Sequence, residues 1–127
     1  MLVDDNNDDN FFHERVIRKI DCADAIVVKQ TAKEAIEFLK QKEQHADLHP
    51  ELIFLDINMP GMNGWEFLQE YENLDPSLKA RIVVVMLTTS ENTDDKVKAE
   101  SYGFLADFKN KPLTKEMLTE VLEKFFP

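Results

Sequence analysis

Cysteine and basic residues are both scarce in this chain of 127 residues. The lone cysteine, Cys22, excludes an internal disulfide and a zinc site built from cysteines. Lysine and arginine number 15 against 25 aspartates and glutamates, which gives a formal net charge of −10. Nucleic acid and anionic membranes are bound through basic side chains that neutralise phosphate, so this charge argues against both partners. The acidic balance suits a bound cation and otherwise indicates only solubility.

Long apolar runs and linker segments are also missing. No stretch approaches the roughly 20 apolar residues that a membrane-spanning helix requires. The segment Met1–Val3 is followed at once by Asp4 and Asp5, which leaves no room for the apolar core of a signal peptide. Repeats, low-complexity tracts and linkers rich in Pro, Gly or Ser are absent as well. We therefore expect one cytoplasmic domain over residues 1–127.

Short, continuously apolar runs alternate with segments of helical periodicity. The runs Ala25–Val28, Leu52–Leu55 and Ile82–Leu87 are rich in Val and Ile, which is typical of strands buried on both faces. Two weaker runs, Leu2–Val3 and Leu105–Phe108, are candidates for the first and last strands. Five strands alternating with five helices predict an α/β fold in which helices cover both faces of a parallel sheet.

Three of the helices have apolar stripes at helical spacing. The stripes are formed by Phe12, Val16 and Ile20 in the first helix, by Ala32, Ala35, Ile36 and Leu39 in the second, and by Met117, Leu118, Val121, Leu122 and Phe125 at the C-terminus. Thr31 and Asn63 each stand three residues before a glutamate, which is the spacing of a capping box. The segment from Asn92 to Tyr102 has few apolar positions, so we expect the least firmly packed helix there, ended by Gly103. The three histidines have no metal-ligand spacing and are expected at the surface.

Polar residues follow four of the five predicted strands. Asp4 and Asp5 follow the first strand, and Asp56 follows the third. Thr88 comes at the end of the fourth strand, and Lys111 comes after the fifth. Because the carboxyl ends of parallel strands meet at one edge of an open α/β sheet, these side chains should converge.

Three converging carboxylates are most easily explained as a cation site. Two carboxylates about 4 Å apart repel each other by roughly 4 kcal/mol at an effective dielectric constant near 20, so the cluster does not stabilise the fold by itself. Oxygen ligands with room for water and phosphate favour Mg²⁺, with Mn²⁺ as an alternative. A carboxylate beside such a metal can attack phosphorus and form an aspartyl-phosphate. The lysine ammonium and threonine hydroxyl can contact phosphoryl oxygens, which completes a phosphoryl-receiving site.

Four motifs, in order and at the right spacing, carry a resemblance to a known family. They are Leu2–Asn6 (LVDDN), Phe54–Gly64 (FLDINMPGMNG), Met86–Ser90 (MLTTS) and Lys111–Leu113 (KPL). With these motifs the sequence resembles the response-regulator receiver domain of two-component signalling, including its single-domain chemotaxis-regulator type, over essentially its whole length. The resemblance implies a (βα)5 flavodoxin-like three-layer sandwich with a five-stranded parallel sheet in the order 2-1-3-4-5.

The same resemblance implies a role for each acidic residue of the site. Asp56 is expected to be the phosphoacceptor and also a ligand of Mg²⁺ or Mn²⁺. Asp5 is expected to bind the metal directly, and Asp4 mainly through water. The main-chain carbonyl of Asn58 is the third protein ligand that the resemblance implies.

Other residues match the family positions that contact the phosphoryl group or respond to it. Thr88 and Lys111 correspond to the contacting residues, and Phe108 stands at the aromatic switch position. Pro112 is expected to follow a cis peptide bond, which is accessible because the bond precedes proline.

The resemblance implies a signalling switch rather than a conventional enzyme. The phosphoryl donor would be a phosphohistidine on a sensor histidine kinase or a histidine phosphotransfer protein, with small acyl phosphates as a second source. Phosphate on Asp56 would draw Thr88 inward and let Phe108 fill the vacated space. This would remodel the face made by the fourth helix, the fifth strand and the fifth helix, which would signal to a partner or relay phosphate. Autodephosphorylation and either a monomer or a phosphorylation-dependent dimer are expected.

Three other functions share some of these sequence features. A phosphatase of the haloacid dehalogenase type requires an acid two residues after its nucleophile, where this chain has Asn58. A flavin-binding flavodoxin is disfavoured because the acidic loop after the first strand would repel a phosphate. An interaction module that keeps the receiver fold without phosphorylation is the remaining alternative, although such a module would normally have lost part of the polar site.

Overall fold

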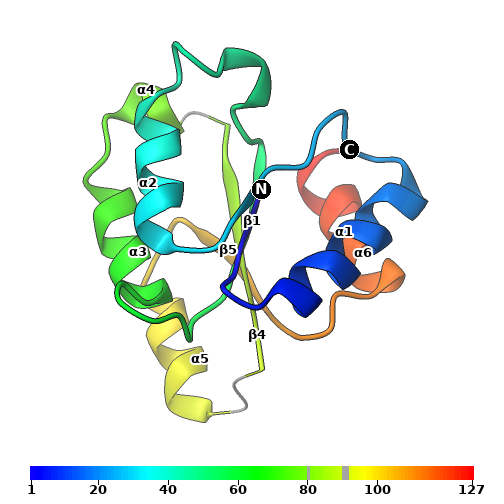
Figure 1. Cartoon of the computed structure of the whole chain (residues 1–127). Helices are drawn as coiled ribbons and strands as arrows, with labels where there is room; N and C mark the ends of the chain where they lie inside the picture. The colour runs from blue at the N-terminus through cyan, green and yellow to red at the C-terminus, as the bar shows by residue number, and fades with distance from the viewer. Residues whose placement is uncertain (80, 90–91) are drawn as a thin grey trace.

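A five-stranded sheet runs through the computed structural model, which describes residues 1–79, 81–89 and 92–127 (Figure 1). Its strands are β1 (Leu2–Val3), β2 (Val28–Lys29), β3 (Leu52–Leu55), β4 (Val83–Thr88) and β5 (Leu105–Asn110). All neighbours pair in parallel in the order β2-β1-β3-β4-β5. The fold class and strand order that the sequence implies are therefore confirmed. Ser90, the last residue of one of the four motifs, lies outside the described residues.

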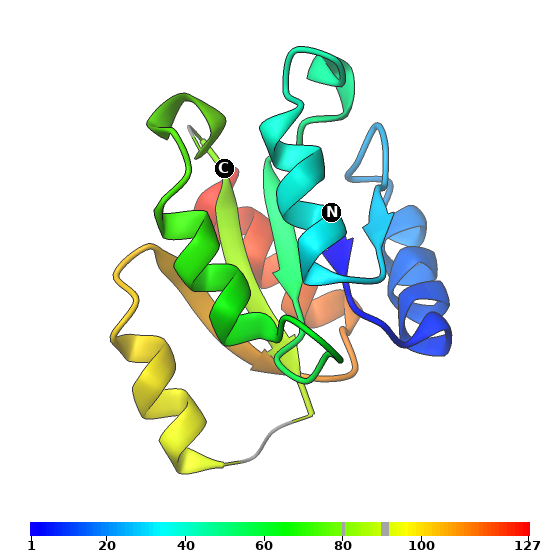
Figure 2. The same ribbon diagram turned by 60° about the vertical axis from the view of Figure 1, so that its left-hand side comes forward.

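Helices cover both faces of the sheet (Figures 1 and 2). On one face lie α1 (Asn7–Ile20) and α6 (Lys115–Phe125). On the other lie α2 (Ala32–Lys40), α3 (Gly64–Glu72) and α5 (Thr93–Glu100). Within the described ranges, no helix combines the length and apolar character needed to cross a bilayer.

The described helices include one short helix that the apolar periodicity does not predict. It is α4 (Pro76–Lys79), a single turn that precedes β4, and a 3₁₀ turn η1 (Ala46–Leu48) also precedes β3. Pro76 suits the first position of a helix, and the Asp75 carboxylate accepts a hydrogen bond from the Ser77 amide at 2.9 Å. One capped turn buries no apolar stripe, which is why its sequence shows no helical periodicity.

Each face of the sheet carries its own hydrophobic cluster. Along β3, Ile53 and Leu55 belong to the cluster beneath α2 and α3, whereas Phe54 belongs to the cluster beneath α1 and α6, with Leu52 packed against it. Successive side chains of a strand point to opposite faces, so a strand covered on both sides reads as one continuous apolar run. This is the physical reason that β3 and β4 are recognisable in the sequence.

The buried face of α1 differs from the predicted apolar stripe. Its buried positions are Asn10, His13 and Ile17, whereas Phe12, which the periodicity places in the stripe, is 49% exposed. The prediction of a surface position for His13 is therefore wrong, because this side chain is 2% exposed. Two of the three buried side chains are polar, so a search for apolar periodicity does not reveal this face.

Several element boundaries also differ from the predictions: β4 begins one residue later and ends at Thr88, and β5 continues to Asn110. β2 is limited to Val28 and Lys29, which pair with the two residues of β1, so the apolar residues before Val28 form no strand. α5 ends at Glu100, with Ser101 as its cap, so Gly103 does not end the helix. Ala99 is the one buried residue of α5, so this helix is weakly packed, but the single turn α4 buries none and is packed less firmly still.

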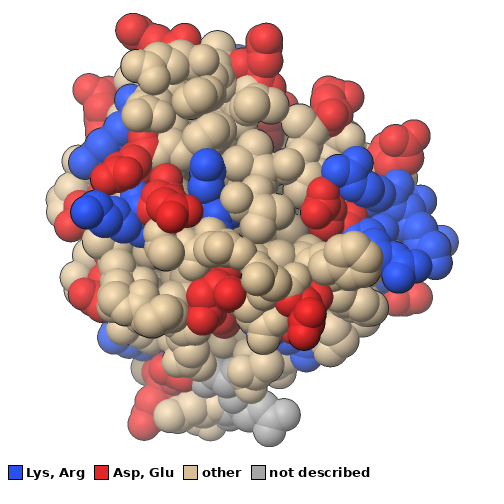
Figure 3. Space-filling view, viewed as in Figure 1, with Lys and Arg blue, Asp and Glu red and all other residues tan. Residues whose placement is uncertain are grey.

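Charged side chains are spread over the face shown in Figure 3, and basic ones gather at the edge where α1 lies. The charged side chains that add up to the net charge of −10 are thus unevenly distributed over this face. This local arrangement does not change the overall repulsion expected toward polyanions.

A capping box holds the start of α3 beside the end of β3. The Asn63 side chain accepts from the Glu66 amide at 2.9 Å, and the Glu66 carboxylate accepts from the Asn63 amide at 3.2 Å, as the spacing predicts. The Gly64 amide donates to the Ile57 carbonyl at 2.8 Å. A Cβ atom at Gly64 would lie 2.4 Å from the Asp56 carbonyl oxygen, so glycine is required for this close approach.

Replacing Gly64 with alanine is expected to destabilise the fold, because a new Cβ would meet main-chain atoms of Asp56 and Ile57 at 2.4 and 2.8 Å. Backbone cannot move aside as a flexible side chain can, so we expect a loss of about 1–3 kcal/mol in urea unfolding. Gly103→Ala is the matched control, since nothing lies within 4 Å of the added carbon. Equal stability of the two variants would contradict the proposed close approach.

Candidate functional site

Main-chain hydrogen bonds carry the sheet beyond the strand ends into the site. The Asp56 amide donates to the Val3 carbonyl at 3.0 Å, and the Asp4 amide donates to the Lys29 carbonyl at 3.1 Å. Where β4 pairs with β5, the Lys111 amide donates to the Thr88 carbonyl at 2.8 Å. These bonds fix the backbone of the polar residues, so their side chains start from defined positions at one edge of the sheet.

Three carboxylates meet at this edge. Asp4, Asp5 and Asp56 each offer one oxygen, and the three oxygens lie within 4.8 Å of one another. Asp4 and Asp56 are buried, with 5% and 7% of their surfaces exposed, whereas Asp5 is exposed. Carboxylate oxygens at this separation match the ligand set of a hard divalent cation such as Mg²⁺. The residues present therefore fit a metal ion of that class.

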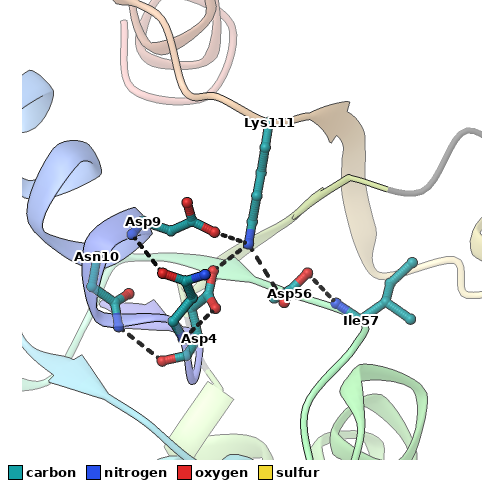
Figure 4. Close-up of polar contacts among 7 residues, drawn as sticks. Asp4, Asp9, Asn10, Asp56, Ile57 and Lys111 are labelled. Atoms are coloured by element: carbon teal, nitrogen blue, oxygen red, sulfur yellow. Dashed lines mark hydrogen bonds and ion pairs between the residues drawn. The ribbon is translucent and has the colours of Figure 1, made fainter.

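The ammonium of Lys111 lies among carboxylates (Figure 4). Its Nζ atom is 2.6 Å from Asp4 Oδ2, 2.8 Å from Asp9 Oδ2 and 3.5 Å from Asp56 Oδ2. Burial alone would lower the pKa of Lys111, but hydrogen bonds to Asp4 and Asp9 and the charge of Asp56 outweigh it and raise that pKa. The lysine therefore stays charged and offsets part of the negative charge of the site.

Opposing influences act on the carboxylate of Asp56. Burial, followed by the charge of Asp4, raises the pKa of Asp56 above its ordinary value. The charge of Lys111 and hydrogen bonds from the Thr88 hydroxyl and the Ile57 amide hold the increase in that pKa back. The Ile57 amide donates to Asp56 Oδ1 at 2.9 Å, which orients the carboxylate. The result is a buried, oriented carboxylate that lacks full charge compensation.

An open cavity of about 610 Å³ lies in front of Asp56. Asp5, Asn58 and Thr89 line it together with Asp56 and Lys111. A small molecule or a side chain of another protein can therefore reach the Asp56 carboxylate from solvent.

Asp4 has a different position from Asp5. Its side chain lines a much smaller cavity behind Asp56, together with Asn10 and His13. Asp4 Oδ1 accepts from the Asn6 amide at 3.0 Å, and Asp4 Oδ2 accepts from Lys111 at 2.6 Å. Both oxygens of Asp4 are thus already engaged within the protein, whereas Asp5 faces the open cavity.

The remaining predicted residues lie in β4, in β5 and directly after β5. Phe108 in β5 is partly buried and packs against the cluster beneath α2 and α3. The peptide bond between Lys111 and Pro112 is cis, as the resemblance implies. Thr88 at the end of β4 is fully buried.

Three site residues on α1 are not found by sequence reasoning. The Asn10 side chain donates to the Asp4 carbonyl at 2.8 Å, and Asp9 binds Lys111. His13 lies behind them, and burial, followed by the charge of Lys111, lowers its pKa. One available signal is Asn6, a favoured N-cap residue, whose side chain accepts from the Asp9 amide and so places Asp9 on the first turn of α1.

Comparison with known proteins supports one family. Residues 1–123 match the response regulator receiver domain. Response regulator Rcp1 from Synechocystis sp. is 35% identical over 96 residues, covering 75% of this chain and 64% of Rcp1. The chain thus spans less than two thirds of the length of that relative.

Two solved structures are similar over almost the whole chain. A two-component response regulator from Cytophaga hutchinsonii superposes with a TM-score of 0.87 at 30% identity, covering 98% of this chain and 92% of that one. A response regulator receiver protein from Dyadobacter fermentans gives a TM-score of 0.85 at 31% identity, covering 99% and 95% of the two chains.

Replacing Asp56 with asparagine is expected to stabilise the metal-free protein at neutral pH. The folded-state pKa of Asp56 is raised, so its ionised form destabilises the fold above that pKa, and the penalty disappears as pH falls through it. We expect a gain of about 1–2 kcal/mol in urea unfolding at neutral pH that vanishes toward about pH 4. The exposed Asp8, replaced by asparagine, is the control and should give a smaller change. A less stable Asp56→Asn variant at neutral pH would mean that attraction to Lys111 dominates.

Proposed function

This chain belongs to the response regulator receiver domain family of two-component signalling, and from that premise we propose that it accepts a phosphoryl group on Asp56. The observation that carries the proposal is the surroundings of the Asp56 carboxylate. It lies in the wall of an open cavity, 3.5 Å from the Lys111 ammonium and hydrogen-bonded by the Thr88 hydroxyl. The nucleophile and the Lys111 ammonium therefore line one accessible cavity, and the buried Thr88 hydroxyl lies beside the nucleophile.

The proposed donor is a phosphohistidine on a sensor histidine kinase or a histidine phosphotransfer protein. An oxygen of the ionised Asp56 attacks the phosphorus atom, and a P–O bond forms as the P–N bond of the donor breaks. The electron pair of that bond stays on the imidazole nitrogen, which takes a proton from water. Lys111 and Thr88 are placed to bind the phosphoryl oxygens as charge shifts during transfer. Small acyl phosphates are a second source of the phosphoryl group.

Asp5, Asp56 and the main-chain carbonyl of Asn58 are the proposed protein ligands of Mg²⁺, with Mn²⁺ as an alternative. Support comes from the cavity, which Asp5 and Asn58 line together with Asp56. Asp4, whose oxygens are bound by Asn6 and Lys111, is proposed to act mainly through water. A bound divalent cation offsets charge on the attacking and transferring oxygens.

The proposed output is a change in the face formed by α5, β5 and α6. This face is the predicted one, since the fourth helix expected from the sequence is α5 once the extra turn α4 is counted. Thr88 is proposed to move toward the phosphoryl group and Phe108 to fill the vacated space. Ala99 is the one buried residue of α5, and Val97 is 60% exposed. Few buried contacts are typical of segments with low local stability, which suits an element that rearranges.

The proposed product of the switch is binding of a downstream protein or relay of the phosphoryl group. Hydrolysis of the aspartyl-phosphate by the protein's own site would reset it, so the protein is proposed to act as a cytoplasmic switch and not as a conventional enzyme. A monomer and a dimer formed on phosphorylation are both compatible with this role. The alternative, an interaction module independent of phosphorylation, is separated from it by the next experiment.

Incubation with acetyl phosphate and Mg²⁺ is expected to add one phosphoryl group, measured by intact mass. Asp56→Asn should gain none, because its amide cannot attack phosphorus. Mg²⁺ binding can be followed by the fluorescence of Trp65, a buried side chain in the first turn of α3, which follows Asp56 in the chain. A protein that binds Mg²⁺ but gains no phosphoryl group and binds no beryllofluoride would be the phosphorylation-independent module.

A further inference from the structure

Asp9 on the first turn of α1 takes part in the site without being one of its clustered metal-binding carboxylates. Its Oδ2 atom lies 2.8 Å from Lys111 Nζ, closer than the 3.5 Å between that ammonium and Asp56 Oδ2. We propose that Asp9 is a positioning residue that competes with the phosphoryl group for the ammonium of Lys111 and so lowers the affinity of the site for phosphoryl. This inference rests on the proposed function.

The geometry around the Lys111 ammonium shows which carboxylates it binds most closely. Lys111 has three N–H donors, and three carboxylates surround it (Figure 4). Charge-assisted N–H···O bonds are typically about 2.7–2.9 Å long, so Asp4 at 2.6 Å and Asp9 at 2.8 Å are hydrogen-bonded to it. The 3.5 Å to Asp56 is an ion pair without a good hydrogen bond. The lysine is thus bound to the neighbours of the phosphoacceptor more closely than to the phosphoacceptor itself.

The hydrogen bonds of Lys111 to Asp4 and to Asp9 differ in how easily they can be exchanged for another partner. The Asp4 side chain is 6% exposed, so breaking its bond would leave a buried carboxylate without its cation. The Asp9 side chain is 35% exposed and lines the open cavity, so water can replace the ammonium there. When a phosphoryl oxygen requires a donor from Lys111, the bond to Asp9 is therefore the one that is given up.

Asp9 is held in place by the start of α1. Its amide donates to Oδ1 of Asn6, the N-cap of α1, at 3.0 Å. The side chain therefore projects from a fixed helix end and not from a free loop. Its carboxylate lines the cavity that a phosphoryl group would enter, where it keeps hold of the Lys111 ammonium.

Asp8 supplies a matched control on the same helix turn. It is exposed and lines the same cavity as Asp9, but it forms no ion pair with any of the residues that the structure describes. Asp8→Asn and Asp9→Asn remove equal charge from the first turn of α1 and weaken its helix-dipole interaction to a similar extent. Only Asp9→Asn also releases Lys111.

The test measures affinity for beryllofluoride in the presence of Mg²⁺, and the rate of phosphorylation by acetyl phosphate. We expect Asp9→Asn to increase both by roughly five- to tenfold, the effect of one charge-assisted contact. Asp8→Asn should change them by about twofold or less, because an exposed charge is screened. Affinity for Mg²⁺ alone should be the same in the two variants, which a merely structural effect on the site would not produce.

A second comparison shows whether Asp9 acts through the lysine. In a Lys111→Ala background, Asp9→Asn should give no further gain, since the contact that it releases is already gone. A gain that persists in that background, or equal effects of Asp8→Asn and Asp9→Asn, would overturn the inference. If Lys111→Ala does not fold, the comparison of the two aspartate variants still decides.

Failure of the inference can be told apart from failure of the proposed function. Suppose that the parent protein takes up phosphoryl and beryllofluoride, but Asp8→Asn and Asp9→Asn have the same beryllofluoride affinity and phosphorylation rate. That result rejects the role of Asp9 and leaves the proposed function standing. A parent protein that binds Mg²⁺ but takes up neither reagent rejects the proposed function, and the inference with it.

Discussion

Attraction between the buried Lys111 ammonium and the surrounding carboxylates is the interaction on which the site depends. Asp4 and Asp56 are both buried, and each would be costly as an uncompensated charge. Lys111 reaches both from the end of β5 and also binds Asp9 on α1. One cation among several carboxylates leaves a negative excess, and a divalent metal is the ligand that would compensate it.

The parallel sheet makes this arrangement possible. Strands that run in one direction place their carboxyl ends at a common edge, and main-chain bonds at Asp4, Asp56 and Lys111 extend the pairing into the site. The close approach of Gly64 to the Asp56 carbonyl fixes the loop between β3 and α3. In contrast, α5 has only one buried residue, so the part of the molecule proposed to respond is held weakly.

The sequence predicts the sheet well because buried strands have a clear apolar signal. Leu52–Leu55 matches β3 without change, and the residues after the strands were sufficient to place Asp4, Asp5, Asp56 and Lys111 together. The apolar pattern does not predict which polar side chains are buried. Hydrophobic periodicity cannot show a helix face made of Asn10 and His13, nor an ion pair between residues as distant in sequence as Asp9 and Lys111. The short helix α4 was missed because it depends on a local cap and not on a buried stripe.

The most direct test of Asp56 as the phosphoacceptor is a crystal structure of the protein with Mg²⁺ and beryllofluoride. One Mg²⁺ should be bound by Asp5, Asp56 and the Asn58 carbonyl, and beryllofluoride should lie on an Asp56 oxygen in contact with Thr88 and Lys111. In that structure Lys111 should remain bound to Asp4 and have left Asp9. A metal held elsewhere, or an Asp56 carboxylate without an adduct while Mg²⁺ is bound, would contradict the assignment of Asp56 as the phosphoacceptor.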